Sequence, residues 1–179
     1  MNIGSASRFR GLLLAALSLV AGLATPVFSQ EASMHTQATQ ATRSDAQIVR
    51  DAFDAWAAGT GGPYQLLDEH ARWTIVGRSA AAGTYPDRES FLREVIRPFN
   101  ARMREPLKPT IRHLYTSDNT VIVLFDAKGI ARDGLPYENT YTWYLTLRDG
   151  RIVDAIAFFD SIAFDEFWRR VAPAPETAR

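Results

Sequence analysis

TVIVLFDAKGIARDGLPYENTYTWYLTLRDGRIVDAIAFF, residues 120–159, is the stretch of the sequence that decides the fold. The pairs Asp133-Gly134 and Asp149-Gly150 divide it into three segments, and Asp-Gly pairs supply the positive φ angles that tight hairpin turns need. Between the two pairs, residues 137–147 alternate in polarity and are rich in Tyr, Thr, Trp and Leu, which suit a half-buried strand. The stretch therefore predicts three consecutive antiparallel strands in a long, curved sheet, which could wrap around a pocket.

The segments around this stretch add helices and further strands. Apolar residues recur with helical spacing, next to capping or turn residues, in four segments: 44–58, 63–67, 87–97 and 162–171. Strands are predicted for residues 71–76 and 108–115. Ser44 is the expected N-cap of the first helix, and Pro98 is expected to kink or break the third helix near Arg97. The order of these elements predicts an α+β roll rather than a parallel α/β sheet.

The first 29 residues have the organisation of a secretory signal peptide. Arg8 and Arg10 form a positive n-region, residues 11–23 an apolar h-region, and Val27-Phe28-Ser29 a cleavage pattern before Gln30. The alternative is a membrane anchor, but the apolar run is about 13 residues long and a spanning helix needs about 20. We therefore predict a periplasmic or secreted protein without a stable membrane anchor.

Composition limits the partners and cofactors of the mature chain. The whole sequence has 20 Lys and Arg against 20 Asp and Glu; removing residues 1–29, with two arginines and no acid, leaves 18 against 20, a formal charge of −2. This balance argues against a nucleic-acid partner. No cysteine occurs, and no histidine or acidic cluster has metal-ligand spacing, so we predict neither disulfide, metal nor cofactor. The predicted segments after the signal are a flexible lead-in at 30–43, one domain at 44–171 and a disordered tail at 172–179.

Asp160 is the first candidate for chemistry. It ends the last predicted strand, in which Ile156, Phe158 and Asp160 share one face because side chains alternate with a period of two. If helices cover that face, burial beside apolar neighbours would raise the pKa of Asp160 and suit it to act as a general base. The alternative is structural, because Asp160-Ser161 directly precedes a helix, where aspartate is a favoured N-cap.

The neighbouring strand carries two sets of side chains, and only one set can face an interior. The sets are Asn139, Tyr141 and Trp143, and Thr140, Thr142 and Tyr144. An amide, a phenol and an indole in one row could donate hydrogen bonds to a ligand oxygen; they could equally form an aromatic core or a dimer face.

Asp126 and His113 are two further candidates. Asp126 interrupts an apolar run and could pair with Asp160 across the sheet, which would raise the pKa of one carboxyl; alternatively, it marks the place where a strand leaves the core. His113 lies within a predicted strand, where it could move protons or serve as a hydrogen-bonded structural residue. His70 is expected at the end of a helix.

Several segments together resemble the SnoaL-like branch of the NTF2-like superfamily. They are Phe53 and Trp56 in the first helix, ARWTIVG at 71–77, Gly83-Thr84-Tyr85, Asp149-Gly150-Arg151-Ile152, and Phe158-Phe159-Asp160. The resemblance covers about residues 44–171. It implies a cone-shaped α+β roll, whose curved mixed or antiparallel sheet wraps around the N-terminal helices and encloses a pocket, commonly as a homodimer. Ketosteroid isomerases, polyketide cyclases, epoxide hydrolases, dehydratases and non-catalytic proteins use this pocket.

The functional residues of these relatives match the sequence only in part. Asp160 matches the aspartate that cyclases and epoxide hydrolases carry at the end of the last strand, and Trp143 falls near the oxyanion-donating aspartate of the ketosteroid isomerases. Thr74 stands where those isomerases carry their base, which disfavours steroid isomerisation. Asp126 is a candidate match for one epoxide hydrolase aspartate, but Leu124 stands where the arginine is expected, which disfavours epoxide opening.

Two functions follow from the sequence. The first is an exported, cofactor-independent enzyme of the isomerase, cyclase, hydrolase or dehydratase type, acting on a small apolar molecule with Asp160 as base and Trp143, Tyr141 or His113 as hydrogen-bond donors. The residues expected to contact the ligand are Trp73, Phe158, Asn139 and Trp56. The second is a non-catalytic periplasmic binding or interaction module in which Asp160 is only a helix cap. The fold does not choose between them, because sites rather than folds carry function.

Overall fold

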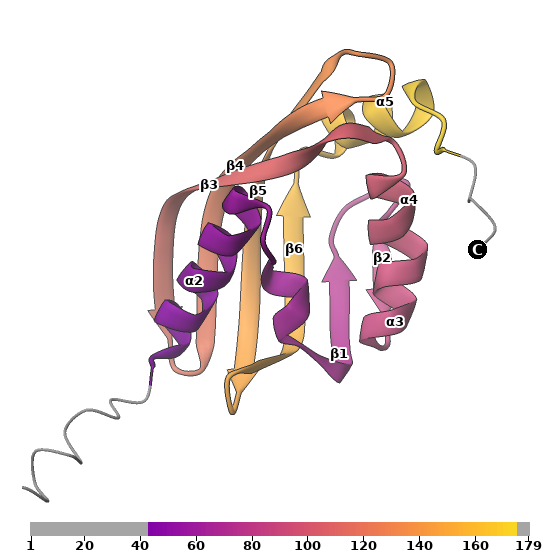
Figure 1. The fold of residues 1–179 in the computed structure, drawn as a ribbon. Coiled ribbons are helices and arrows are strands. Elements are labelled where there is room, and N and C mark those ends of the chain that lie inside the picture. Colours follow the sequence, from indigo (N-terminus) through magenta and orange to yellow (C-terminus); the bar gives the residue numbers. More distant parts are fainter. Residues whose placement is uncertain (1–42, 175–179) are drawn as a thin grey trace, which may run out of the picture. The chain divides into compact units, whose positions relative to one another are not determined.

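A curved, open sheet of six strands is the main layer of residues 43–174, the part of the chain that the computed structural model describes (Figure 1). The strands are β1 Leu67–Ile75, β2 Gly83–Tyr85, β3 Met103–Ser117, β4 Thr120–Ala131, β5 Pro136–Arg148 and β6 Arg151–Phe159. Their order in the sheet is β2-β1-β6-β5-β4-β3. β1 pairs in parallel with β6, and the other neighbours are antiparallel. The predicted α+β class is confirmed; the predicted signal peptide lies outside the described residues.

The helices pack against this sheet. They are α2 Asp45–Ala58, the 3₁₀ turn η1 Pro63–Leu66, α3 Arg88–Phe91, the π-helical segment η2 Leu92–Ile96, α4 Arg97–Asn100 and α5 Ser161–Arg170. Helix α2 contacts β3 and β4, whereas α3 contacts β1 and α5 contacts β5 (Figure 1). The space between these helices and the sheet contains the hydrophobic core.

Local sequence chemistry explains the two hairpins that were predicted. Gly134 and Gly150 have φ angles of 88° and 71°, and Asp149 has a φ of 52°. These positive angles are accessible to glycine and tolerated by aspartate. The turns therefore join β4 to β5 and β5 to β6 where the Asp-Gly pairs occur, as predicted.

The first helix also begins and ends as the sequence predicts. Ser44 Oγ accepts a hydrogen bond from the Gln47 amide at 3.2 Å, and Gly59 closes the helix with a φ of 74°. Val49 and Phe53 are fully buried on its inner face. This helix is therefore held by both caps and by its apolar face.

The sequence predicts that Pro98 kinks or breaks the third helix near Arg97, and the break does not occur. The backbone stays helical through Asn100, and the π-helical segment lies directly before α4. Proline donates no backbone hydrogen bond, and a wider π turn changes the hydrogen-bond ladder just where that donor is missing. The result is one continuous, irregular helical arm from α3 to α4.

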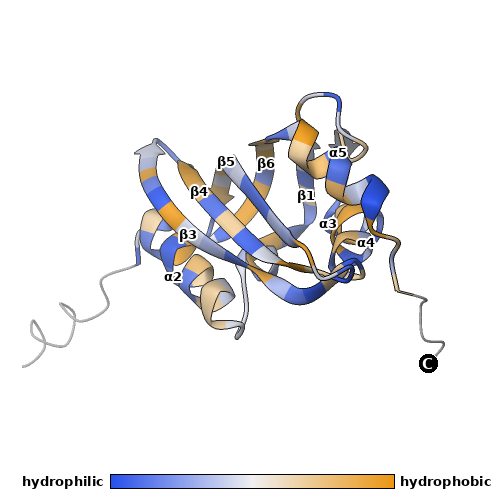
Figure 2. Ribbon diagram, turned by 90° about the horizontal axis from the view of Figure 1, so that it is seen from above, coloured by the Kyte–Doolittle hydropathy of each residue, from blue (hydrophilic) through white to orange (hydrophobic). Residues whose placement is uncertain are grey.

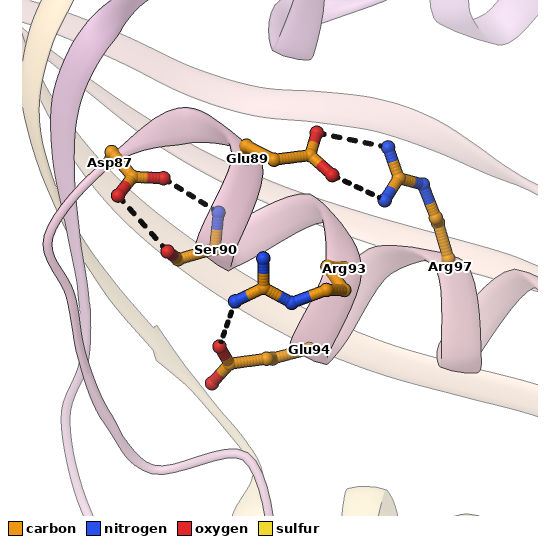
Figure 3. Close-up of polar contacts among 6 residues, drawn as sticks. All are labelled: Asp87, Glu89, Ser90, Arg93, Glu94 and Arg97. Carbon is orange, nitrogen blue, oxygen red and sulfur yellow. Dashed lines mark hydrogen bonds and ion pairs between the residues drawn. The ribbon is translucent and has the colours of Figure 1, made fainter.

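Polar side chains brace the start of this helical arm (Figure 3). Asp87 caps α3 by accepting from the Ser90 amide at 2.7 Å and the Ser90 hydroxyl at 3.0 Å. The backbone N–H of Ser90 is the main cause of the lowered pKa of Asp87. Glu89 accepts two hydrogen bonds from Arg97 at 2.7 and 3.0 Å, so that this pair connects α3 to α4 across the π-helical segment.

The start of β1 differs from the prediction. β1 begins at Leu67, so His70 is an exposed strand residue and does not end a helix. The pairing of Leu67 with Ile152 of β6 extends the strand toward its N-terminus. This contact between distant segments is not visible in local sequence patterns.

The burial pattern of β5 decides which of its two faces is interior. Tyr137, Asn139, Tyr141, Trp143 and Leu145 are buried in strict alternation. Figure 2 shows much of β5 in pale and blue shades, because Tyr, Trp, Thr and Asn are not hydrophobic on its scale, so burial and not hydropathy separates the two faces of this strand. The set containing Asn139, Tyr141 and Trp143 therefore faces the helices, and the set containing Tyr144 faces outward.

Candidate functional site

An apolar cavity lies between the inner face of the sheet and the helical arm. Its volume is about 50 Å³, which is room for only a few water-sized groups. It is lined by Trp56, Tyr64, Trp73, Ile75, Phe91, Val95, Ile96, Phe99, Leu107, Tyr141, Trp143, Ala157, Phe159 and Phe164. Aromatic rings make up most of this wall, and none of the described residues that line it carries a carboxylate, imidazole, ammonium or guanidinium group.

The structure brings four of the predicted site residues together in this wall: Trp56, Trp73, Tyr141 and Trp143. Trp143 is stacked against Trp56 at a centroid distance of 5.9 Å and meets the edge of Trp73 at 5.0 Å. Trp73 in turn stacks on Phe91 at 4.3 Å, with 9° between the ring planes. The rings thus pack against one another, both stacked and edge-on, in one aromatic cluster that forms part of the wall.

Trp73 contributes a buried polar atom without a partner to this wall; the other such side-chain atoms among the described residues, Ser79 Oγ and Arg102 Nε, belong to residues that do not line the cavity. The Trp73 Nε1–H is buried and has no hydrogen-bond partner among the described residues. A buried donor without a partner costs about 1–3 kcal/mol, and such groups are rare in folded proteins. An acceptor atom from a ligand or a water would remove this cost.

A chain of hydrogen bonds reaches the same cavity from β5. Asn139 Nδ2 donates to Tyr137 Oη at 3.0 Å, and the Tyr137 and Tyr141 hydroxyls are 3.0 Å apart. Burial is the main cause of the raised pKa values of Tyr137, Tyr141 and Tyr64. These phenols are therefore protonated at neutral pH, and Tyr64 and Tyr141 present hydroxyl donors in an otherwise apolar wall.

Asn139 itself has a different environment from the one predicted. It is buried but is not part of the cavity wall. Its Nδ2 donates to the Asp160 carbonyl at 3.0 Å, and its Oδ1 accepts from the Asp160 amide at 3.0 Å. The amide therefore clamps the backbone where β6 ends and α5 begins, and the expectation that it contacts a ligand in this pocket is not met.

Of the two alternatives for Asp160, a buried general base or a helix cap, the contacts of the side chain fit the cap. The side chain is exposed and does not line the apolar cavity. Its Oδ1 accepts from the amides of Ile162 and Ala163 at 2.9 and 3.3 Å, which is the arrangement of a helix N-cap. Asp160 is in this position because β6 ends at Phe159 and α5 begins at Ser161, so Asp160 is the residue directly before the helix.

Asp160 variants are expected to affect stability through the cap alone. Asp160→Ala removes the acceptor and should lower the free energy of unfolding by about 0.5–2 kcal/mol. Asp160→Asn keeps an acceptor oxygen and should cost a few tenths of a kcal/mol, since both residues are good N-caps. Urea denaturation of both variants measures the difference. Equal losses in the two variants would contradict the capping role.

Three other predicted residues lie outside the cavity. Phe158 is 44% exposed on the outer face of β6, and the wall residue is its neighbour Phe159. His113 is exposed on β3, beside a register irregularity, and stacks on Tyr115. Asp126 is exposed and accepts from the Thr140 hydroxyl at 2.7 Å. Their predicted roles in an enclosed site lack support, because strand alternation places Phe158 and Asp126 on the outer face.

An open groove on the outer face brings Asp126 and Asp160 to the same surface. It has a volume of about 580 Å³, and its wall includes Lys108, Lys128 and Glu138. No hydrogen bond connects the two aspartates among the described residues. The carboxylate pair expected from the sequence is therefore part of a mixed-charge surface and not of a desolvated dyad.

Sequence reasoning missed several wall residues, most clearly Tyr64, Phe91 and Phe159. Tyr64 follows Pro63 at the start of η1, and Phe91 is the apolar residue at the end of α3. The small residues Ala155 and Ala157 alternate along β6, a signal that large side chains from the helices could fill that inner face. Phe159 continues this set.

Two further properties concern residues 43–174. Within this range, no helix is long and apolar enough to cross a membrane. In the same part of the chain, no three His, Cys, Asp or Glu side chains are grouped so that they could hold a metal ion.

Family comparison agrees with the fold. The sequence model of the SnoaL-like domain matches residues 49–155, which is more than half of the chain. The protein therefore belongs to the SnoaL-like domain family. No curated protein matches the sequence.

Solved structures show the same fold. Bal32a, from a soil-derived mobile gene cassette, is 28% identical, with a TM-score of 0.57 and coverage of 70% of this chain and 96% of that chain. An NTF2-like protein from Burkholderia thailandensis is 22% identical, with a TM-score of 0.58 and coverage of 70% and 97%. A Bacillus subtilis protein provisionally called an isomerase is 18% identical, with a TM-score of 0.55 and coverage of 71% and 96%. The last two likenesses concern the fold alone.

Proposed function

We propose that this protein binds a small, flat, largely apolar organic molecule that carries a hydrogen-bond acceptor. The observation that carries the proposal is the unpartnered, buried Nε1–H of Trp73 in a wall made mostly of aromatic rings. Apolar pockets with a few polar groups are the usual form of small-molecule sites. A carbonyl or ether oxygen would satisfy Trp73 while the rings contact the body of the ligand.

Tyr141 is the second proposed donor. Tyr137 Oη already accepts from Asn139 Nδ2. In the hydrogen bond between the Tyr137 and Tyr141 hydroxyls, either hydroxyl can be the donor. When Tyr137 donates, the Tyr141 proton is left for a ligand oxygen. Asn139 and Tyr137 would then act on the ligand only by orienting Tyr141.

The binding role is favoured over acid–base catalysis by Asp160. No group that could serve as a general base at neutral pH lines the cavity among the described residues, and Asp160 Oδ1 is used by two backbone amides. A carbon-bound proton must lie within hydrogen-bond reach of its base. We therefore propose the non-catalytic role for this chain.

The test uses two probes of nearly the same shape, 2-acetylnaphthalene and 2-isopropenylnaphthalene, which differ in whether the side group ends in an oxygen or a methylene. Calorimetric titration should show tighter binding of the ketone, by about fivefold, because one neutral hydrogen bond contributes about 1 kcal/mol. Trp73→Phe keeps an aromatic ring but removes the donor, and should abolish the difference between the probes. The NMR signals of the four tryptophan indole N–H groups give a second readout. The signal that is missing from the spectrum of Trp73→Phe belongs to Trp73, and in the wild type this signal should shift when the ketone is added.

Two results would contradict the proposal. If neither probe binds, the cavity is not a site for such molecules. If both bind equally to the wild type, the cavity takes apolar molecules but Trp73 does not recognise an acceptor. Asp160→Asn is the matched control, and it should bind the ketone as the wild type does.

We propose further that two copies of the chain associate through the outer face of β5 and β6. Tyr144, Ile156 and Phe158 are 39%, 38% and 44% exposed and form an apolar patch on this face. Tyr144 pairs with Ile156, Thr142 pairs with Phe158, and the rings of Tyr144 and Phe158 meet edge-on at 6.1 Å. Contiguous exposed apolar groups are typical of protein contacts, and one patch can pair with itself about a two-fold axis.

Phe158→Glu is expected to convert the homodimer to a monomer. The variant would bring two like charges together at the centre of the interface and would remove the apolar contacts of Phe158. Light scattering coupled to size-exclusion chromatography measures the mass. Tyr115→Glu is the control, since Tyr115 is an exposed aromatic residue on the more distant strand β3. A monomeric wild type at micromolar concentration would refute this association.

Export by a cleaved signal peptide is also proposed, from the n-region, h-region and cleavage pattern within residues 1–29. The intact mass of the protein recovered from the periplasm or medium should correspond to a chain that begins at Gln30. Leu17→Arg, in the h-region, should retain the precursor in the cell. Recovery of the uncleaved chain from the wild type would contradict the proposal.

A further inference from the structure

A second space lies next to the apolar cavity and opens to the surface. Its volume is about 490 Å³, and we call it the vestibule. It is bounded by residues of η1 and the loop before it, by the end of the helical arm and by the start of β3. Trp56, Tyr64, Ile96, Phe99 and Leu107 line both spaces. These shared side chains place the two spaces against each other.

The sizes of the two spaces indicate that a ligand uses both. The cavity alone, at about 50 Å³, is well below the ~300–1,000 Å³ of typical small-molecule sites. The vestibule has the missing volume and, by its shared walls, gives access to the aromatic rings. One end of a bound molecule would therefore contact the cavity, and its other end would remain in the vestibule.

The vestibule differs from the cavity in its polar groups. Gln65, Asn100 and Arg104 line it, and no aspartate or glutamate is part of its wall. Gln65 Oε1 accepts from the Gly62 amide at 3.3 Å, so its Nε2 is left to donate. The Asn100 side chain is exposed and has no hydrogen bond among the described residues. The groups that remain available are thus mainly donors, together with one guanidinium.

Arg104 makes only a long ion-pair contact with its neighbour Glu105. Its Nη2 is 3.7 Å from Glu105 Oε1, and its side chain is 57% exposed. A contact of this length between exposed groups contributes little. A planar guanidinium can bind a carboxylate through two parallel hydrogen bonds. The charge of the vestibule therefore complements an anionic group and not a cationic one.

We infer that the ligand is an amphipathic aromatic acid, with a hydrogen-bond acceptor at its inner end and a carboxylate held at Arg104 in the vestibule. This inference rests on the proposed binding function. Arg104 and the shared wall residue Leu107 are three residues apart on β3, in a stretch where the pairing with β4 shifts register, so they are separated by at most about 10 Å along the strand. A molecule with two fused rings and groups at opposite ends has this length.

The test compares 6-acetyl-2-naphthoate with its neutral methyl ester. In the wild type, calorimetric titration at low salt should show that the acid binds about five- to tenfold more tightly than the ester, with the difference shrinking as salt is added. Arg104→Gln should remove this preference while leaving the affinity for the ester unchanged. Arg104→Lys keeps the positive charge but lacks the planar guanidinium, and this variant should retain part of the preference for the acid.

Arg112→Gln is the matched control. Arg112 lies on the same strand, is 53% exposed and has a similarly long contact, 3.6 Å, with Asp126; it does not line the vestibule. This variant should retain the preference for the acid. Thermal unfolding of each variant confirms that it is folded.

The outcomes separate the inference from the function on which it rests. If the ester binds but Arg104→Gln leaves the affinity for the acid unchanged, the anionic site is refuted and the apolar binding function stands. If the wild type binds the ester as tightly as the acid, the anionic site is likewise refuted. If neither compound nor 2-acetylnaphthalene binds, the proposed function fails and the inference fails with it.

Discussion

Trp143→Ala is expected to lower the free energy of unfolding by about 3–5 kcal/mol, the usual cost of truncating a large buried aromatic residue. Trp143 is 4% exposed. Its ring lies 4.9 Å from Phe125, 5.0 Å from Trp73 and 5.7 Å from Phe53, measured between centroids. These contacts join α2, β1 and β4 to β5. Removing the indole would therefore leave a cavity at the point where the helices meet the sheet.

Urea denaturation followed by circular dichroism measures this effect without relying on tryptophan fluorescence. Tyr115→Ala is the control, because Tyr115 is an aromatic residue that is 57% exposed and should cost less than about 0.5 kcal/mol. A loss below about 1 kcal/mol for Trp143→Ala would mean that the cluster relaxes around the missing ring. It would contradict a central packing role.

Asn139→Ala is expected to lower the free energy of unfolding by about 2–4 kcal/mol, since it leaves buried polar groups without partners. The Asn139 side chain makes three hydrogen bonds of 3.0 Å: two to the Asp160 backbone and one to Tyr137 Oη. The variant should also loosen the start of α5. Amide hydrogen exchange within α5 should therefore accelerate more than exchange within α2.

Two further variants test whether the lost hydrogen bonds cause the destabilisation by Asn139→Ala. Asn139→Asp preserves size and one acceptor but loses both donated hydrogen bonds and buries a charge, so it should be at least as destabilising as Asn139→Ala. Asn119→Ala is the control, since Asn119 is exposed and its side chain has no hydrogen bond among the described residues. Equal exchange rates in α2 and α5 after Asn139→Ala would contradict the clamp.

The hairpins and the first helix could be predicted because their causes are local. Asp149 and Gly150 both adopt positive φ angles in the turn between β5 and β6, and Ser44 caps α2 with its own side chain. The alternation of β5 correctly paired Asn139 with Tyr141 and Trp143 on one face. Each of these properties depends on residues a few positions apart.

The errors have a common physical origin in contacts between distant segments. His70 belongs to a strand because β1 pairs with β6. The sequence placed Phe158 with the pocket because strand alternation alone leaves open which face is covered. The packing of the helices against Ala155 and Ala157 made Phe159 the wall residue.

The sequence by itself determined the α+β class, the hairpin turns, the resemblance to the SnoaL-like domains and the set of side chains that share each face of a strand. Tertiary structure alone decided which face became the interior, that Asp160 caps α5, and that Trp73 has a buried donor without a partner. The reason is that turn geometry and alternation are fixed by neighbouring residues, whereas burial and hydrogen-bond satisfaction depend on which distant segments the folded chain brings together.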